Sequence, residues 1–224
     1  MNRPVAPRQL VLALDHAASF AREDFLEGPS NAAALALIDG WPDWPSRVMA
    51  LVGPEGAGKT HLASIWAEAA GARVFAAKLL EHGNLPAALA TGALVLEDLA
   101  ADVLDEAALF HLLNLAREER AYVLITARTA PAALPVTIRD LASRLRAIPL
   151  VTLDAPDDAL LRAVIVKLAA DRQIGVDEAL VNYLATRIER SFAAARRALA
   201  RLDEEAMRQH RPVTRALAAE LFRA

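Results

Sequence analysis

The segment GPEGAGKT, residues 53–60, carries residue types that bind phosphate. It matches the pattern G-x-x-x-x-G-K-[ST], whose glycines let backbone N–H groups turn toward phosphate oxygens. Lys59 would pair with the β and γ phosphates of ADP or ATP, and the Thr60 hydroxyl would coordinate Mg²⁺. The alternative is a glycine turn that arose by chance. A strand expected before the segment and a helix expected after it favour nucleotide binding, with these candidate residues: Gly53, Pro54, Glu55, Gly56, Ala57, Gly58, Lys59 and Thr60.

Two adjacent acidic residues, Glu97 and Asp98, come at the end of an apolar run that begins at residue 93. The carboxyl ends of strands in an open α/β sheet form the edge where ligands bind. One acid could hold Mg²⁺ and the other could orient a water molecule for hydrolysis. We predict Glu97 and Thr60 as metal ligands and both acids as catalytic residues. The alternative is a pair of acids favoured by the dipole at a helix start.

Hydrophobic runs indicate the elements that must position these residues. Short apolar runs bounded by turn residues predict strands at 48–52, 73–77, 93–97, 122–126 and 147–151. Helices are expected at 59–70, about 78–90, 105–119 and about 137–145, and another is opened by Ser30 or Asn31 and closed by Gly40. Strands that alternate with helices predict an α/β fold with a five-stranded parallel sheet covered on both faces.

The strand signals stop near residue 154, and helical spacing of apolar residues takes over. Leu161, Ile165 and Leu168 are three or four residues apart, as on one face of an amphipathic helix. The sequence therefore predicts an N-terminal segment (1–18), an α/β nucleotide-binding core (19–154) and a small all-helical lid (155–224).

Composition excludes several other kinds of site. The 224 residues include no cysteine, so disulfides and thiolate metal sites are excluded, and the five histidines show no metal-ligand spacing. No apolar run approaches the roughly 20 residues of a membrane-spanning helix, and a cytoplasmic protein is expected. The net charge of −3 does not suit a dedicated nucleic-acid binder. Only the C-terminal third is locally basic, as at Arg190, Arg196, Arg197 and Arg201, which we interpret as a solvated helix face.

Three motifs together resemble the DnaA branch of the AAA+ ATPases. They are FLEGPSN at 25–31, the extended phosphate loop GAGKTHL at 56–62 and DLASRLR at 140–146, which is similar to box VII. The resemblance implies an AAA+ core with a helical lid, and it adds His61 to the nucleotide-binding residues. It also implies that Arg144 is an arginine finger, which reaches the γ-phosphate of a neighbouring molecule. The alternative is a surface salt bridge between Arg144 and Asp140, which stands where the family has a further arginine.

The N-terminal stretch QLVLAL, residues 9–14, resembles the peptide by which partners dock on the sliding clamp of DNA polymerase III. An extended peptide can bury aliphatic side chains in a groove while its glutamine makes a directional hydrogen bond. The alternative is a first strand packed on the chain's own core. The candidate clamp-binding residues are Gln9, Leu10, Leu12 and Leu14.

The combined resemblance implies a regulator of replication initiation in the bacterial cytoplasm, near the nucleoid. Such a protein docks on the clamp (the polymerase β subunit) and stimulates hydrolysis of DnaA-bound ATP. It would contact DNA mainly through the clamp and no membrane, and a second copy of the chain is a further candidate partner. Two other interpretations are a small-molecule kinase and an AAA+ scaffold or helicase-loader-like protein that binds single-stranded DNA.

Several positions depart from the family pattern, and all of them concern hydrolysis. Glu97 stands where relatives usually have aspartate, and Arg128 where they have an acidic or polar sensor. The lid sensor arginine aligns with Ala193, although Arg190 and Arg196 are within one turn of it. These departures predict a site that binds nucleotide but hydrolyses it slowly by itself.

Overall fold

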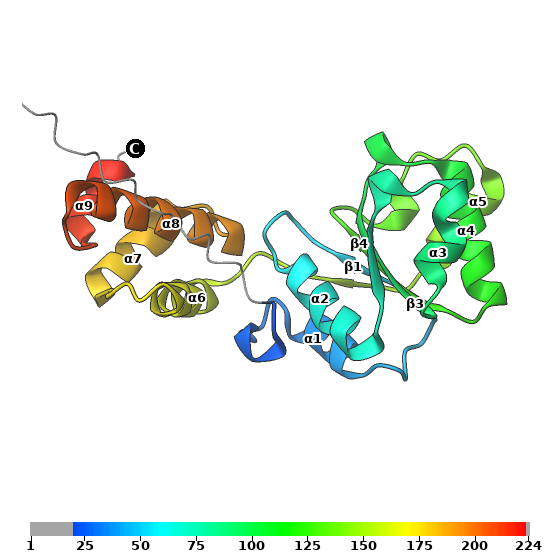
Figure 1. Cartoon of the computed structure of the whole chain (residues 1–224), viewed down its shortest axis with the longest axis horizontal. Helices are drawn as coiled ribbons and strands as arrows, with labels where there is room; N and C mark the ends of the chain where they lie inside the picture. Colours follow the sequence, from blue (N-terminus) through cyan, green and yellow to red (C-terminus); the bar gives the residue numbers. More distant parts are fainter. Residues whose placement is uncertain (1–19, 223–224) are drawn as a thin grey trace, which may run out of the picture.

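A five-stranded parallel sheet forms the centre of the first part of the chain (Figure 1). The computed structural model describes residues 20–222. For Val103 within this range, it describes the backbone alone. The strands are β1 (Val48–Val52), β2 (Arg73–Ala76), β3 (Ala93–Leu99), β4 (Tyr122–Ala127) and β5 (Leu150–Thr152), in the order β2-β3-β4-β1-β5. Every neighbouring pair is parallel. The sheet confirms the predicted α/β fold.

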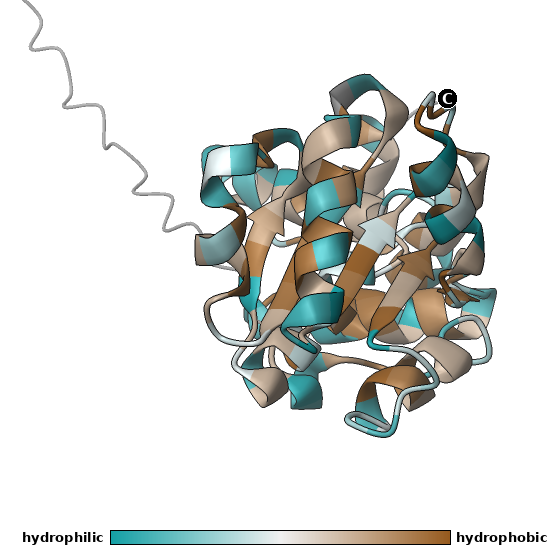
Figure 2. Cartoon of the chain, turned by 90° about the vertical axis from the view of Figure 1, so that its right-hand side faces the viewer, coloured by the Kyte–Doolittle hydropathy of each residue, from teal (hydrophilic) through white to brown (hydrophobic). Residues whose placement is uncertain are grey.

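Helices cover both faces of the sheet, because successive strand side chains point to opposite faces. Leu51 of β1 packs with α1 (Ala32–Asp39) and α2 (Lys59–Ala70). Its neighbours Ala50 and Val52 pack with α3 (Leu85–Leu89), α4 (Glu106–Glu118) and α5 (Arg139–Ala147). Figure 1 shows the two groups of helices on opposite sides of the sheet, and the strands are coloured mainly as hydrophobic in Figure 2.

The chain between β2 and β3 differs from the single helix predicted at about 78–90. It forms two short 3-10 turns, η2 (Ala77–Leu79) and η3 (His82–Asn84), and then α3. Pro86 has no N–H to donate inside a continuous helix, so it is tolerated only in the first turn of α3. Asn84 also bonds back to the backbone at Glu81 and Leu79 (3.1 and 2.8 Å), which ends the preceding segment.

The fifth strand is shorter and begins later than the predicted 147–151. Helix α5 continues to Ala147, and β5 covers only three residues. Because β5 is an edge strand that pairs with β1 alone, few backbone hydrogen bonds define its ends. The remaining 3-10 turns of the described chain are η1 (Arg22–Asp24), η4 (Ala101–Val103) and η5 (Pro131–Ala133).

The last four helices form a separate apolar core, which we call the lid. They are α6 (Asp158–Asp171), α7 (Glu178–Arg187), α8 (Phe192–Gln209) and α9 (Arg215–Leu221). Each begins after a side chain that accepts a backbone N–H, and such N-caps stabilise a helix by about 1 kcal/mol; the four are Asp157, Asp177, Ser191 and Thr214. Between residues 20 and 222, no helix is long and apolar enough to cross a membrane.

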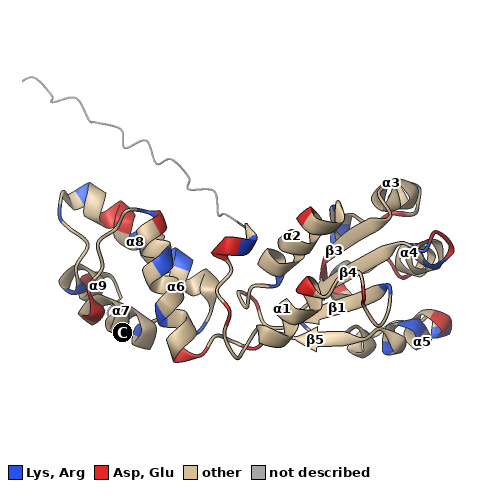
Figure 3. Ribbon diagram, turned by 90° about the horizontal axis from the view of Figure 1, so that it is seen from below, with Lys and Arg blue, Asp and Glu red and all other residues tan. Residues whose placement is uncertain are grey.

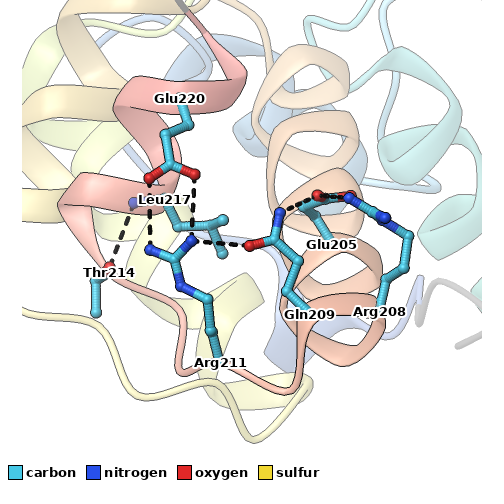
Figure 4. A network of polar contacts seen from close by, with 7 residues as sticks. All are labelled: Glu205, Arg208, Gln209, Arg211, Thr214, Leu217 and Glu220. Atoms are coloured by element: carbon cyan, nitrogen blue, oxygen red, sulfur yellow. Dashed lines mark hydrogen bonds and ion pairs between the residues drawn. The ribbon is translucent and has the colours of Figure 1, made fainter.

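A network of charged side chains joins the end of α8 to α9 (Figure 4). Glu205 accepts hydrogen bonds from Arg208 and Gln209. Arg211 donates to Gln209 at 2.8 Å and pairs with Glu220 of α9 at 3.3 Å. The hydrogen bond from Arg208, and then that from Gln209, lower the pKa of Glu205 from 4.5 to about 2.

We expect Glu205→Gln to lower the melting temperature slightly at neutral pH and not at all near pH 2. A carboxyl group with a depressed pKa stabilises the fold above its unfolded value of 4.5 and ceases to do so as the pH falls toward about 2. Thermal unfolding of both proteins across this range measures the effect. A difference in melting temperature that stays constant with pH would refute the assignment.

Candidate nucleotide-binding site

The glycine-rich loop connects the end of β1 to the start of α2, as its sequence predicts. Gly56 and Gly58 have φ of 75° and 100°, the left-handed region that favours glycine. A Cβ at Gly53 would lie 2.4 Å from the carbonyl oxygen of Leu153. These positions therefore require glycine, and the loop ends at the positive end of the α2 dipole, which favours phosphate.

Lys59 lies inside the loop. Its ammonium donates hydrogen bonds to the carbonyl oxygens of Gly53 and Pro54, both at 2.8 Å, and the residue is buried. Burial lowers the pKa of Lys59, and the carboxylate of Asp98 acts in the opposite direction. A buried cation is stabilised by a nearby anion, so the loop is suited to a phosphate group.

The two acids occupy different positions because β3 has an irregularity in its pairing with β4 between Leu96 and Leu99. Asp98 has a φ of 55°, and its backbone N–H donates to the Thr126 hydroxyl at 3.0 Å. Burial raises the pKa of Glu97, and a hydrogen bond with Thr60 opposes that shift. Glu97 and Thr60 are therefore in contact, and their oxygens are of the type that Mg²⁺ prefers. Within the described chain, no group of three or more His, Cys, Asp or Glu side chains could hold a metal ion.

A cavity of about 580 Å³ lies between the loop and the lid. Asp98, Lys59 and Thr60 line its polar end. At another wall, the His61 ring contacts Phe20 and Phe25 edge to face, with centroids 5.4 and 5.2 Å apart. Burial lowers the pKa of His61, although a hydrogen bond to a backbone carbonyl opposes the shift. Aromatic walls beside a phosphate loop suit a nucleotide, whose base is apolar and whose phosphates are charged.

The motif FLEGPSN fixes the segment before α1 against both halves of the molecule. The Asn31 side chain, 2% exposed, accepts the N–H of Gly28 at 2.9 Å and donates to the Leu26 carbonyl at 3.0 Å. A Cβ at Gly28 would lie 2.9 Å from the Cδ2 atom of Leu160 in α6. The motif therefore lets the core and the lid approach each other closely.

A salt bridge between α6 and the segment before α1 also joins the lid to the core. The sequence did not predict this salt bridge. Lys167 of α6 pairs with Asp24 at 2.7 Å and with Asp171 at 2.8 Å. Burial opposes its charge, but the hydrogen bonds to these two carboxylates raise the pKa of Lys167. Only its helical spacing from Asp171 could have been seen in the sequence, since Asp24 is distant along the chain.

The lid reaches the phosphate loop through the start of α8. The Phe192 N–H donates to the Gly56 carbonyl at 2.9 Å, and a Cβ at Gly56 would lie 2.9 Å from that of Ala193. Of the two nearby arginines, Arg190 pairs with an aspartate, Asp158. Arg196 lines the cavity, and its pKa is lowered by burial and by Arg172. Of Arg190 and Arg196, Arg196 is therefore the one that lies in the cavity, which Lys167 and Arg172 of the lid also line.

Arg128 follows β4 and also lines the cavity. It pairs with Glu55 of the phosphate loop at 2.7 Å, and both side chains are exposed. The pair lies beside Lys59 in the lining of the cavity, where an incoming phosphate would compete with Glu55 for Arg128.

Arg144 lies in α5, away from this cavity. Its guanidinium stacks over the Phe110 ring at 4.9 Å, and no ion pair joins it to Asp140, although both residues are in the described chain. The candidate clamp residues Gln9, Leu10, Leu12 and Leu14 lie outside the described residues.

The sheet order, the phosphate loop between β1 and α2 and the surrounding helices match the fold of the AAA+ domains of DnaA and RuvB. No protein-family model and no curated protein sequence matches the chain.

The fold is similar to several solved structures. Domain III of the replication initiation protein DnaA from Thermotoga maritima has a TM-score of 0.72 and 19% identity, over 90% of this chain and 95% of that one. DnaA bound to AMPPCP and single-stranded DNA has a TM-score of 0.64 and 19% identity, over 85% and 68% of the two chains. A mutant of RuvB from T. maritima has a TM-score of 0.65 and 21% identity, over 85% and 66%.

Proposed function

We propose that this chain is a nucleotide-bound AAA+ regulator of replication initiation, of the type of Hda, which inactivates DnaA. It docks on the DNA polymerase sliding clamp and stimulates hydrolysis of DnaA-bound ATP through Arg144. Its own ADP or ATP, with Mg²⁺, occupies the cavity beside Lys59. Thr60 and Glu97 would hold the Mg²⁺, which lowers the charge of the phosphates when it is bound.

The observation that carries this proposal is the position of Arg144. The phosphate loop follows the carboxyl end of β1, whereas Arg144 lines a cavity with Arg47 and Val48 at the amino end of the same strand. A five-residue strand separates its two ends by about 13 Å. Arg144 therefore cannot reach this chain's own nucleotide, and a phosphate that it contacts must belong to another molecule.

Slow hydrolysis by the chain itself is part of the proposal. The Arg128–Glu55 salt bridge occupies the position where relatives have an acidic or polar sensor. Glu97, which stands where relatives usually have aspartate, is one methylene group longer. An activator that supplies a cation to its partner needs little turnover of its own.

The decisive experiment measures the hydrolysis of ATP preloaded on DnaA, with and without this chain and with and without DNA-loaded clamp. We expect rapid hydrolysis only when both are present, and turnover of free ATP by this chain alone below about 1 s⁻¹. Hydrolysis that does not change on addition of the chain would overturn the proposal.

A second candidate function is the binding of single-stranded DNA, because a DnaA structure with a similar fold is bound to it. The basic lid residues support it only weakly. Arg190 pairs with Asp158, and Arg197 lies 3.8 Å from Glu189, so carboxylates already neutralise two of these cations. Tight binding to single-stranded DNA that weakens steeply with salt would favour this function.

The clamp peptide has its own test. We expect the double variant Gln9→Ala, Leu12→Ala to lose clamp binding in a pull-down while its nucleotide affinity and melting temperature stay unchanged. Val11→Ala is the matched control, because in an extended peptide its side chain points away from the side that Leu10, Leu12 and Leu14 share. If the segment is instead a core strand, the double variant will retain clamp binding and melt earlier, since burial of one leucine contributes roughly 1.5–3 kcal/mol.

A further inference from the structure

A second cavity, of about 710 Å³, lies at the amino ends of the strands, whereas the phosphate loop lies at their carboxyl ends. Its floor is apolar and includes Leu113 of α4 and Ile148 after α5. Four arginine residues also line this cavity, and no acidic residue of the described chain lines it. These residues are Arg47, Arg117, Arg120 and Arg144. We call the site that they line the arginine cavity.

These four cations have no acidic partner in the part of the chain that the structure describes. Among residues 20–222, every ion pair of an arginine involves a residue other than these four. Glu118 and Glu119 lie between Arg117 and Arg120 in the sequence but do not line the cavity. A guanidinium that has no carboxylate partner can bind an anion through charge-assisted hydrogen bonds. The arginine cavity is therefore suited to a ligand with several negative charges.

Two of the guanidinium groups are held in place before any ligand binds. Arg47 donates to the Arg120 carbonyl oxygen at 2.7 Å, and its guanidinium lies over the Tyr122 ring at 4.6 Å. Arg144 is held over Phe110 in the same way. A planar guanidinium with a fixed orientation binds phosphate through paired hydrogen bonds and loses little entropy.

The arginine cavity surrounds the amino ends of β1 and β4, whereas the chain's own nucleotide site lies at their carboxyl ends. Figure 3 shows α5, with its basic segments, on the side of the core away from the lid. An anion in this cavity consequently comes from a molecule docked on that side.

We propose that the arginine cavity receives the phosphate chain of a nucleotide held by a docked partner, and that Arg47, Arg117 and Arg120 let this protein distinguish a triphosphate from a diphosphate. That the partner is DnaA rests on the function proposed above. The additional phosphoryl group of ATP adds negative charge and acceptor oxygens, which the three arginines bind together with Arg144. After hydrolysis these contacts are lost, so the partner is released in its ADP form.

The first experiment tests the cavity without any partner. Inorganic tripolyphosphate is titrated calorimetrically into the full chain in excess ADP, which occupies the phosphate loop. We expect one binding site, with an affinity that falls at least about tenfold in the variant Arg117→Ala, Arg120→Ala, because charge-assisted hydrogen bonds are lost. Arg162→Ala removes an exposed lid charge and is the matched control. Melting temperatures show whether each variant is folded. Absence of binding, or equal affinity of the double variant, would overturn the assignment of the cavity.

The second experiment compares association of the wild type and the double variant with DnaA–ATP and DnaA–ADP on clamp-loaded DNA. We expect the wild type to prefer the ATP form by about tenfold or more and the double variant to lose this preference. A preference retained by the double variant would overturn the role of these arginines. If the wild type associates with neither form, the proposed function fails, while the tripolyphosphate titration still decides whether the cavity binds phosphate.

Discussion

Arg144→Ala should abolish the stimulation of DnaA-bound ATP hydrolysis, with a loss in rate on the order of 10³–10⁵. A guanidinium beside the transferring phosphoryl group stabilises charge that develops in the transition state, and alanine cannot replace it. Single-turnover hydrolysis of ATP preloaded on DnaA, in the presence of DNA-loaded clamp, measures the loss. Clamp binding and nucleotide binding by the variant should remain at wild-type levels.

The matched control for this prediction is Arg146→Ala, which removes an exposed arginine from the same helix, outside the arginine cavity. We expect it to stimulate hydrolysis normally. The stacking of Arg144 on Phe110 contributes about 0.5–1 kcal/mol at an exposed site, so Arg144→Ala should remain folded. Normal stimulation by Arg144→Ala would remove this residue from the mechanism. The result for Arg146→Ala would then show whether Arg146 takes this role, and Arg139 would be the next residue to test.

Lys59→Ala is expected to abolish detectable binding of ADP and ATP, a loss of at least about 100-fold in affinity. The Lys59 ammonium is the buried cation of the phosphate loop, and no other lysine lines the phosphate end of the cavity in the described chain. Isothermal calorimetry measures the effect. We expect the fold to persist, because glycine conformations and the α2 packing maintain the loop.

Lys78→Ala provides the matched control, since Lys78 is an exposed lysine in η2 with no place in the cavity. Its affinity for ADP should equal that of the wild type. Unchanged affinity of Lys59→Ala would show that nucleotide does not bind in the loop. A Lys59→Ala protein that melts much earlier would instead show that the hydrogen bonds to Gly53 and Pro54 maintain the loop in the absence of ligand.

Local patterns in the sequence were sufficient to predict the parallel sheet and the position of the phosphate loop. The predicted strand 48–52 and helix 59–70 match β1 and α2 residue for residue. Both elements are long enough to show a clear hydrophobic pattern, and the glycines between them are required by their own backbone conformation. The sequence therefore determined the α/β fold and the residues of the loop, and it predicted a regulator whose clamp peptide and arginine finger remain to be tested.

The tertiary structure alone decided which charged residues meet. In the sequence, the lid sensor arginine aligned with Ala193, and either Arg190 or Arg196 could have taken its place. The packing of α8 on the phosphate loop places Arg196 in the cavity. Arg47, Arg144 and the nearby pair Arg117 and Arg120 come from three separate parts of the sequence, and the fold brings them to one cavity at the amino ends of the strands. Such contacts depend on how whole elements pack, and a surface charge contributes too little to local stability to leave a pattern in the sequence around it.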